Sequence, residues 1–445
     1  MYHKRIKRSP KFRLLSISIG LVILLCTLVA CSMPMIDIMM AEAVMPKVEP
    51  TVDRSEPIVS NNETITPTTV PWLDSPPITP TTGPWLDSPP ITNSTPAAQI
   101  NPALMAELES LRANLHQDLQ MWIAAGDLAR PNGYVYAVDL GQLLLYFANQ
   151  DDLENYTSVR KLAMRNLILD DPSDPYTQGF VGWRYSPTEA LDASSTSEGL
   201  LVAKALWRGF QQFYDPVDEE LSLLILEGYA KHAFVDQEIW LIRNYFNLKT
   251  RSFAPNSYLV NYDPDFVQEV AESINNSDLA ELAQNSNDLI RQGQAPSGLL
   301  HTMVLPEVKI LYPDSDIVVF SPNDIIQFSN ACAIAEKVIK NDPELARQTL
   351  GFAESKLDTL MTYYYGQTGN PVTEEPARLS EWSCLVRVAA KLNEPALTEH
   401  FIERALPFWK SFDEQPGEPR LYQTGQILLA IDAVVENDIL RSNSQ

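Results

Sequence analysis

The stretch from Ser195 to Tyr214 reads STSEGLLVAKALWRGFQQFY and begins with four polar residues. Its apolar residues then recur at intervals of three and four, as at Leu200, Ala203 and Trp207, which is the period of one helix face. Ser195, just before the periodic run, is a typical helix N-cap. The pattern predicts a helix over residues 196–214.

The same period recurs from about residue 101 to the end of the chain and predicts a domain built of helices. The other expected helices are 103–125, 135–149, 153–169, 218–234, 238–247, 265–274, 278–291, 323–341, 343–365, 379–392, 394–409 and 421–435. The longest segment without this period is 292–322. Its apolar run Ile317-Val318-Val319-Phe320 fits a short strand pair or an excursion over one face.

Two all-α architectures fit this many helices. One is a closed ring of six helical hairpins, the (α/α)6 toroid, and the other is an open solenoid. Solenoids repeat a shared pattern at a fixed period, and this sequence has none. Its loops differ in length and carry Trp, Tyr, Asn and Asp, which suits a toroid whose loops form a cleft at one end. We therefore expect residues 101–445 to form an (α/α)6 toroid.

The N-terminus has the pattern of a bacterial export signal. Residues 14–30 are almost entirely apolar, which is short for a membrane span, and end in Leu28-Val29-Ala30 before Cys31. This ending resembles a lipobox, which implies cleavage before Cys31 and stable anchoring through lipid on its thiol. The alternative is an uncleaved signal anchor. We expect 1–30 to be a signal peptide and the protein to be extracytoplasmic, lipid-anchored to the cell membrane or outer surface. The basic residues before the apolar run are Lys4, Arg5, Lys7, Arg8, Lys11 and Arg13.

Residues 31–100 are rich in Pro, Thr and Ser and predict a disordered linker. Residues 65–77 are repeated as 78–90, with Gly83 in place of Val70. The segment fits a semi-rigid stalk. The alternative is that the repeated Pro-Trp-Leu-Asp-Ser-Pro element, with Trp72 and Trp85, docks on a partner.

Net charge, sequence motifs and cysteine content exclude several classes of partner and of binding site. The 445 residues carry a net charge of -24, and without the six basic residues of the signal segment 27 basic residues face 57 acidic ones. Such an acidic chain repels phosphate backbones, so we expect no nucleic-acid partner. HExxH, P-loop, GxGxxG and CxxC patterns are absent, so we expect no metal or cofactor. Cys332 and Cys384 fit either a disulfide or two separate buried thiols.

Three segments, in order, resemble glycoside hydrolase family 8, a six-hairpin toroid family that cleaves β-1,4-glucans and related polysaccharides by inversion. Residues 139–142 read Asp-Leu-Gly-Gln where the family has Ser-Glu-Gly-Gln. Residues 195–206 resemble the family's Ala-Thr-Asp-Ala-Asp-Leu-Asp-Ile-Ala-x-Ala-Leu segment. Between this second segment and the third, residues 256–258 are also similar to the family's Asn-Pro-Ser-Tyr. Residues 322–327, Pro-Asn-Asp-Ile-Ile-Gln, resemble Tyr-Asp-Ala-x-Arg, which opens a helix in the family.

The resemblance implies a catalytic base at Asp324 but leaves the general acid open. Leu140 stands at the acid position, Ser197 at the second-motif Asp and Gln327 at the Arg. An inverting glycosidase needs one carboxyl to protonate the leaving oxygen and another to activate water, and leucine does neither. Glu198 or Asp139 is therefore the candidate acid. The structural alternatives are a capping box between Ser195 and Glu198, and a first-turn helical acid at Asp324.

Several polar and aromatic residues are candidates for glycan binding, because rings stack on sugar faces and carboxylates bond their hydroxyls. Asp192 has a structural alternative as a loop cap, and the aromatic residues have one as core; Glu381 could project into a cleft from a late inner helix. The candidates are Asp192, Trp183, Tyr185, Tyr258 and Glu381.

Three functions follow as hypotheses. The first is a divergent glycoside hydrolase acting on a polysaccharide or oligosaccharide. The second is a non-catalytic descendant that binds or guides a glycan during export or surface assembly. The third, a helical scaffold for protein partners, would require a flat apolar face.

Overall fold

The computed structural model describes residues 100–445 except 237–238, 306–318, 322, 413–418 and 443–445. The predicted signal peptide, the lipid site Cys31 and the linker up to residue 99 lie outside the described residues. Among the residues that are described, no helix combines the length and apolar character needed to cross a membrane.

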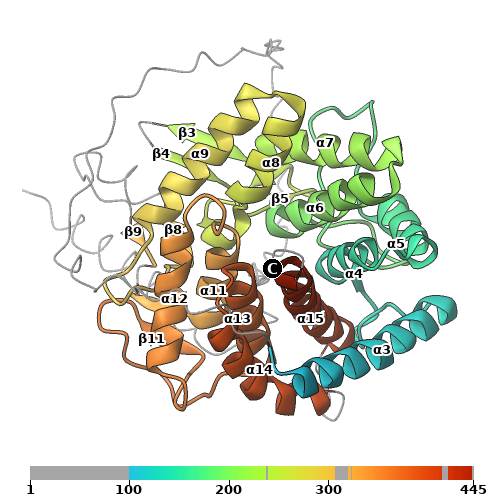
Figure 1. The fold of residues 1–445 in the computed structure, drawn as a ribbon. Helices are drawn as coiled ribbons and strands as arrows, with labels where there is room; N and C mark the ends of the chain where they lie inside the picture. Colours follow the sequence, from blue (N-terminus) through green and yellow to red (C-terminus); the bar gives the residue numbers. More distant parts are fainter. Residues whose placement is uncertain (1–99, 237–238, 306–318, 322, 413–418, 443–445) are drawn as a thin grey trace, which may run out of the picture. The chain divides into compact units, whose positions relative to one another are not determined.

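The helices form two concentric layers around a centre (Figure 1). The inner helices are α4 (Ala137–Asn149), α6 (Thr196–Phe213), α11 (Phe328–Glu336), α13 (Leu379–Lys391) and α15 (Arg420–Ser442). The outer helices are α3 (Pro102–Ala125), α5 (Leu153–Asn166), α7 (Pro216–Ala230), α9 (Ser277–Gln292), α12 (Pro343–Ser355) and α14 (Pro395–Lys410).

The sixth inner position is irregular. The 3-10 turn η1 (Leu259–Asn261) contacts both α6 and α11, and α8 (Pro264–Ile274) follows it and packs on α9. The ring closes where α15 packs against α4 and α3, which joins the two ends of the folded domain. The predicted (α/α)6 toroid is therefore confirmed, and an open solenoid is excluded.

Several outer helices begin with a side-chain cap that three of the inner helices lack. Asn101 and Asp342 each precede a proline, and their side chains accept hydrogen bonds from first-turn amides of α3 and α12. The inner helices α4, α6 and α11 begin after extended residues whose side chains make no cap bond. The first-turn amides of these inner helices are therefore not capped by their own N-cap side chains.

Short antiparallel strands lie between the helices. β1 (Val135–Tyr136) pairs with β2 (Arg184–Tyr185), and β10 (Ile325–Gln327) pairs with β11 (Tyr363–Tyr365). β5 (Phe246–Asn247) pairs with β6 (Ser252–Phe253), and β7 (Ser257–Tyr258), β8 (Met303–Leu305) and β9 (Val319–Phe320) form a three-stranded sheet. The strand pair within 292–322 is thus confirmed by β8 and β9.

Three of the helix predictions are wrong for one physical reason. Residues 233–236 (β3) and 239–242 (β4) form a hairpin where a helix over 238–247 was expected. Helix α11 begins at Phe328 and not at residue 323, and α12 ends at Ser355 and not at residue 365. The misassigned segments are rich in Ile, Trp and Tyr, which favour extended backbone when they pair across a sheet.

The interior is continuous from helix to helix. Its largest fully buried side chains include Trp409, Tyr146, Tyr262 and Phe328. Cys332 of α11 and Cys384 of α13 are separate buried thiols. The exposed large apolar side chains do not share one element, since they are Met121, Leu153, Tyr176, Tyr214, Val217 and Tyr365.

Asp432 of α15 lies in the contact that closes the ring. It is 5% exposed, accepts a hydrogen bond of 2.9 Å from Gln150 Nε2, and lies 3.8 Å from Arg112 of α3. Burial raises the pKa of Asp432 to about 7, although Arg112 acts in the opposite direction. The closing contact therefore contains a carboxyl that titrates near neutral pH.

This carboxyl predicts a specific dependence of stability on pH. The unfolded chain releases the Asp432 proton near pH 4, whereas the folded chain keeps it up to about pH 7. The free energy of unfolding should therefore fall as the pH rises from 4 to 7 and stay low above that. Asp432→Asn should remove this fall and stabilise the protein by about 2–4 kcal/mol at pH 8. Urea unfolding at pH 5 and pH 8 measures the free energy of unfolding, with a substitution of the exposed Asp170, Asp170→Asn, as control. Equal pH dependence of this free energy in wild type and Asp432→Asn would contradict the prediction.

Candidate active site at one mouth of the ring

The first turns of the inner helices meet at one end of the toroid. Outer helices that run back separate successive inner helices, and α14 precedes the inner helix α15 in the same way, so the inner helices point the same way. We call this end the mouth; it comprises the first turns of α4, α6, α11, α13 and α15 and the described residues just before them. Helix N-termini favour negative charge, so the mouth suits carboxylates.

Asp139, in the first turn of α4, is fully buried and bound by Arg130. Arg130 Nε donates to Oδ2 at 2.8 Å and Nη2 donates to Oδ1 at 2.7 Å. Burial raises the pKa of Asp139, the charge of Glu198 acts in the same direction, and the Arg130 bonds oppose both. Because both oxygens accept bonds from one guanidinium, Asp139 is poorly placed to give a proton to a ligand.

Glu198 lies in the first turn of the neighbouring helix α6 and is 6% exposed. The hydroxyls of Ser195 and Ser197 both donate to its Oε2. No residue in the described part of the chain donates to Oε1. The expected capping box does not form, because Ser195 bonds the Glu198 carboxylate and makes no side-chain cap bond.

Asp324 lies just before β10 and not in a helical first turn, so that structural alternative is wrong. Its Oδ2 accepts a 2.9 Å bond from the Gln367 amide, and its own backbone has a left-handed φ of 53°. No residue that the structure describes donates to Oδ1. Since β10 leads directly into α11, Asp324 belongs to the loops of the mouth.

Glu381, in the first turn of α13, is 2% exposed and accepts a 2.9 Å bond from the Arg378 amide. Burial raises the pKa of Glu381. Tyr422 of α15 lies near Arg130, Asp139 and Glu381, and burial raises the pKa of this tyrosine to about 12. Glu381 thus caps its helix beside the other acids of the mouth.

An aromatic wall stands beside the start of α4. The Arg184 guanidinium lies 4.0 Å from the Trp183 ring and 4.1 Å from the Tyr134 ring. Tyr136 meets Trp183 edge-on at 5.5 Å and lies 3.9 Å from the Arg130 guanidinium. Such stacking restrains rings in a fixed orientation. We call Tyr134, Tyr136, Trp183 and Arg184 the aromatic wall.

The remaining predicted binding residues have the following places. Asp192 accepts bonds from Trp183 Nε1 at 2.7 Å and Arg184 Nη2 at 3.2 Å, so it anchors the aromatic wall. Tyr185 is half-buried in β2 and pairs with Val135. Tyr258 is half-buried in β7 beside η1, and burial raises its pKa. Trp183, Tyr185 and Asp192 therefore come together, whereas Tyr258 sits at another inner position.

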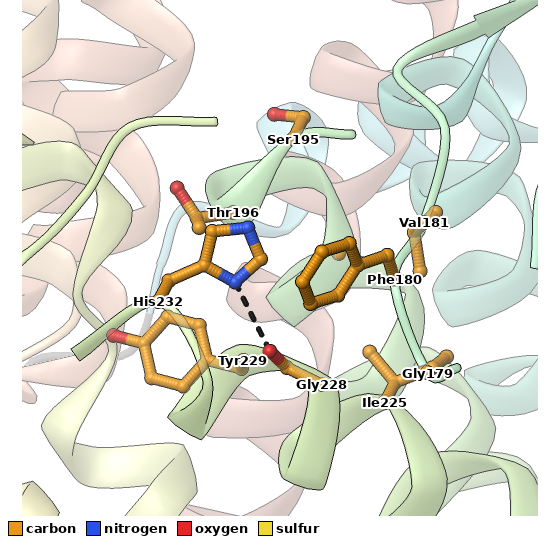
Figure 2. Close-up of a pocket in the computed structure, with 10 residues that line it drawn as sticks. Gly179, Phe180, Val181, Ser195, Thr196, Ile225, Gly228, Tyr229 and His232 are labelled. Atoms are coloured by element: carbon orange, nitrogen blue, oxygen red, sulfur yellow. Dashed lines mark hydrogen bonds between the residues drawn. The ribbon is translucent and has the colours of Figure 1, made fainter. Parts of the chain in front are cut away.

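The neutral side chain of His232 hydrogen-bonds the segment that precedes α6. His232 Nδ1 donates to the Gly228 carbonyl at 3.0 Å, so its Nε2 accepts from the Ser194 hydroxyl at 3.2 Å. Burial lowers the pKa of His232 to about 4. Figure 2 shows this imidazole beside Phe180 and below Ser195 and Thr196, at a small buried pocket. The arrangement sets the backbone from which Glu198 projects.

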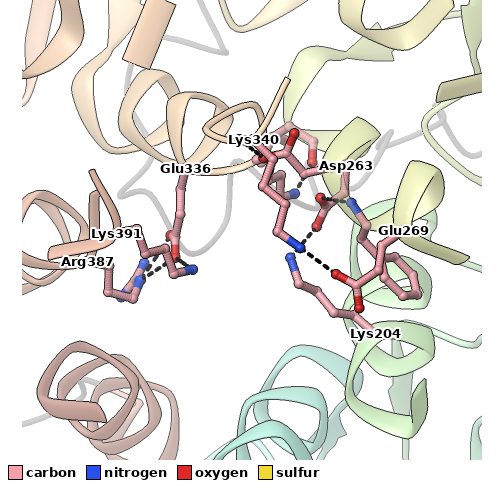
Figure 3. A network of polar contacts seen from close by, with 11 residues as sticks. Lys204, Asp263, Glu269, Glu336, Lys340, Arg387 and Lys391 are labelled. Atoms are coloured by element: carbon pink, nitrogen blue, oxygen red, sulfur yellow. Dashed lines mark hydrogen bonds and ion pairs between the residues drawn. The ribbon is translucent and has the colours of Figure 1, made fainter. Parts of the chain in front are cut away.

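Deeper in the ring, ion pairs connect the inner helices (Figure 3). Glu336 of α11 accepts from Arg387 at 2.9 Å and from Lys391 at 2.7 Å, both from α13. Burial would raise the pKa of Glu336, but these two cations hold it below its ordinary value. Lys204 of α6 donates to Asp263, the N-cap of α8, at 2.9 Å. The ion pairs hold neighbouring inner helices together below the mouth.

Sequence reasoning missed Arg130, Tyr134, Tyr136, Arg184 and Tyr422. The first three come from an irregular loop and a two-residue strand, which give no periodic signal. In the described part of the chain, no group of three or more His, Cys, Asp or Glu side chains is placed to hold a metal ion.

No protein family and no curated protein matches the sequence. Solved structures do match. A β-1,3-1,4-glucanase from Paenibacillus sp. X4 has a TM-score of 0.57 and 12% identity over 77% of this chain and 95% of its own. An alpha-amylase from Clostridium perfringens has a TM-score of 0.56 and 14% identity, over 67% of this chain and 86% of its own.

A family 8 xylanase mutant from Teredinibacter turnerae, in complex with xylohexaose, has a TM-score of 0.50 and 13% identity over 69% of this chain and 83% of its own. The chain therefore has the fold of six-hairpin glycosidases, and its resemblance to glycoside hydrolase family 8 is confirmed at the level of fold.

Proposed function

We propose that the protein is a glycoside hydrolase that cleaves a polysaccharide at the mouth by inversion, with Glu198 as general acid and Asp324 as general base. One observation carries this proposal. Each carboxylate has one oxygen held by the protein and the other without a bond from the described residues. This arrangement orients a carboxyl while leaving an oxygen for the substrate.

The proposed reaction needs both carboxyls. Glu198 gives its proton to the leaving glycosidic oxygen as the bond from that oxygen to the anomeric carbon breaks. Water attacks the anomeric carbon from the opposite face and gives a proton to Asp324. Glu198 ends ionised and Asp324 protonated, and exchange with solvent restores both. Asp139 is the weaker candidate acid, because Arg130 occupies both of its oxygens.

The aromatic wall supports binding of a glycan beside the first turn of α4. Trp183 and Tyr136 border the loop that leads into α4, and Tyr185 continues the adjacent strand. Rings of this kind pack against the C–H faces of sugars. The matched structures are named for β-glucan, starch-type and xylan activities, so the substrate class we propose is a neutral polysaccharide without a specified linkage.

The location belongs to the proposal as well. The lipobox-like ending before Cys31 supports a lipid anchor, and the Pro/Thr-rich linker would give the toroid reach from the membrane. A lipid-anchored hydrolase would meet polysaccharide outside the cytoplasm.

A second candidate is a non-catalytic protein that binds or guides a glycan. It is favoured by one observation: Leu140, at the family's acid position, is fully buried and has no ionisable group. The aromatic wall would serve binding equally well in this case.

Incubation with polymeric glycans separates the two candidates. We expect the purified protein to release reducing ends from at least one of β-1,4-glucan, mixed-linkage β-glucan, xylan and starch. Proton NMR of the first products should show inverted anomers. Binding in affinity electrophoresis with no release of reducing ends would instead support the second candidate.

A further inference from the structure

The loop that carries Asp324 is tied to the turn after β11. The Gly366 amide donates to the Asp324 carbonyl at 2.7 Å, and the Gln367 amide donates to Asp324 Oδ2. The Asp324 amide in turn donates to the Ser321 carbonyl at 2.7 Å. The carboxylate is therefore fixed, and its Oδ1 faces Gly366.

Gly366 allows Asp324 and His301 to approach each other closely, because any side chain at this position would collide with both. A Cβ at this position would lie 2.6 Å from Asp324 Oδ1 and 2.9 Å from Cε1 of His301. Oδ1 and this carbon are therefore no more than 5.5 Å apart, the sum of the two distances. Because Cε1 is bonded to both ring nitrogens, the near edge of the imidazole lies within roughly the 5.5–6 Å that one bridging water spans between two hydrogen-bond partners.

His301 is held in place, and one of its ring nitrogens lacks a partner in the described structure. Its backbone amide donates to the Gly293 carbonyl at 2.9 Å, and its ring stacks on Phe320 at 6.1 Å. The side chain is 8% exposed, and its Nδ1 is buried with no hydrogen-bond partner in the described structure. Burial lowers the pKa of His301, although the charge of Asp324 opposes this, so the ring is neutral near pH 7.

We propose that His301 holds the nucleophilic water against Asp324. This inference rests on the proposed hydrolase function and adds a residue that neither the motif resemblance nor the fold assigns. The water donates one hydrogen to Asp324 Oδ1 and the other to the ring nitrogen that carries a lone pair. During attack, the water oxygen bonds to the anomeric carbon, its first proton passes to Asp324, and the second stays on the new hydroxyl.

His301→Ala tests the role. We expect kcat to fall by about 10²-fold with KM nearly unchanged, because the water loses its orientation while the glycan contacts remain. Free imidazole added to His301→Ala should restore part of the rate, and His301→Gln should retain more activity than His301→Ala. His400→Ala, an exposed histidine on α14, is the matched control and should behave as wild type.

The role of His301 and the proposed hydrolase function can fail separately in these experiments. Full activity in His301→Ala, or loss of activity that imidazole does not restore in a variant with wild-type circular dichroism, would overturn the role of His301 alone. A wild type that cleaves none of the glycans would overturn both the proposed function and this inference.

Discussion

Replacing Glu198 with glutamine should reduce hydrolysis of a natural polysaccharide by about 10²- to 10⁴-fold, the range that general acid catalysis contributes. Glutamine keeps the shape and can still accept from Ser195 and Ser197, so KM should change little. The measurement is reducing-end release at saturating glycan. Glu220→Gln, an exposed glutamate on α7, is the matched control and should keep wild-type activity.

The leaving group makes this prediction sharper. The phenolate of an aryl glycoside with an acidic phenol leaves without being protonated. Glu198→Gln should therefore recover most of the wild-type rate on that substrate. Asp324→Asn should lose activity on both substrates, because water still needs a base. Equal losses of Glu198→Gln on both substrates would contradict its role as the acid, and an active Asp324→Asn would contradict the role of the base.

Arg130→Met should destabilise the fold by about 3–5 kcal/mol, the cost of leaving a buried charge without its partner. Asp139 would remain fully buried next to Glu198, with its two hydrogen bonds lost. Urea unfolding at pH 8 gives the value. Arg251→Met is the matched control, since Arg251 also bonds one aspartate through two nitrogens but is 53% exposed; its loss should be under about 1 kcal/mol.

Two further measurements identify the mechanism of this loss. Adding Asp139→Asn to Arg130→Met should recover much of the stability, because the unpaired charge is gone. The single variant should also be less destabilised at pH 5 than at pH 8. Without Arg130 the pKa of Asp139 in the folded state would rise further above its unfolded value, so stability is lost as the pH rises. A loss that is independent of both pH and Asp139 would indicate broken packing around Tyr136 instead.

The ring could be predicted from sequence because its helices are long and periodic. α6, α9, α13 and α14 begin within one residue of the expected positions. Prediction failed where short segments pair across the chain. Ile325-Ile326 and Tyr363-Tyr364 are ambiguous alone, and only their register in the folded ring makes them strands.

The candidate site was predictable only in part, for a related reason. Glu198 and Asp324 were found because each lies within a segment that resembles a family motif. Arg130 lies in no such segment, and only the fold shows that it hydrogen-bonds both carboxylate oxygens of Asp139. No sequence pattern indicated His301 either, because its proximity to Asp324 depends on the absence of a side chain at Gly366.

The contact of α15 with α4 and α3 has a consequence for biogenesis. The helix that completes the toroid follows all the other described helices in the chain, so nearly the whole folded domain must be synthesised before α4 can bury the face that α15 covers. Contacts between such distant segments form slowly, because loop closure costs entropy before packing compensates it. A nascent or C-terminally trimmed chain would therefore be the form most exposed to proteases.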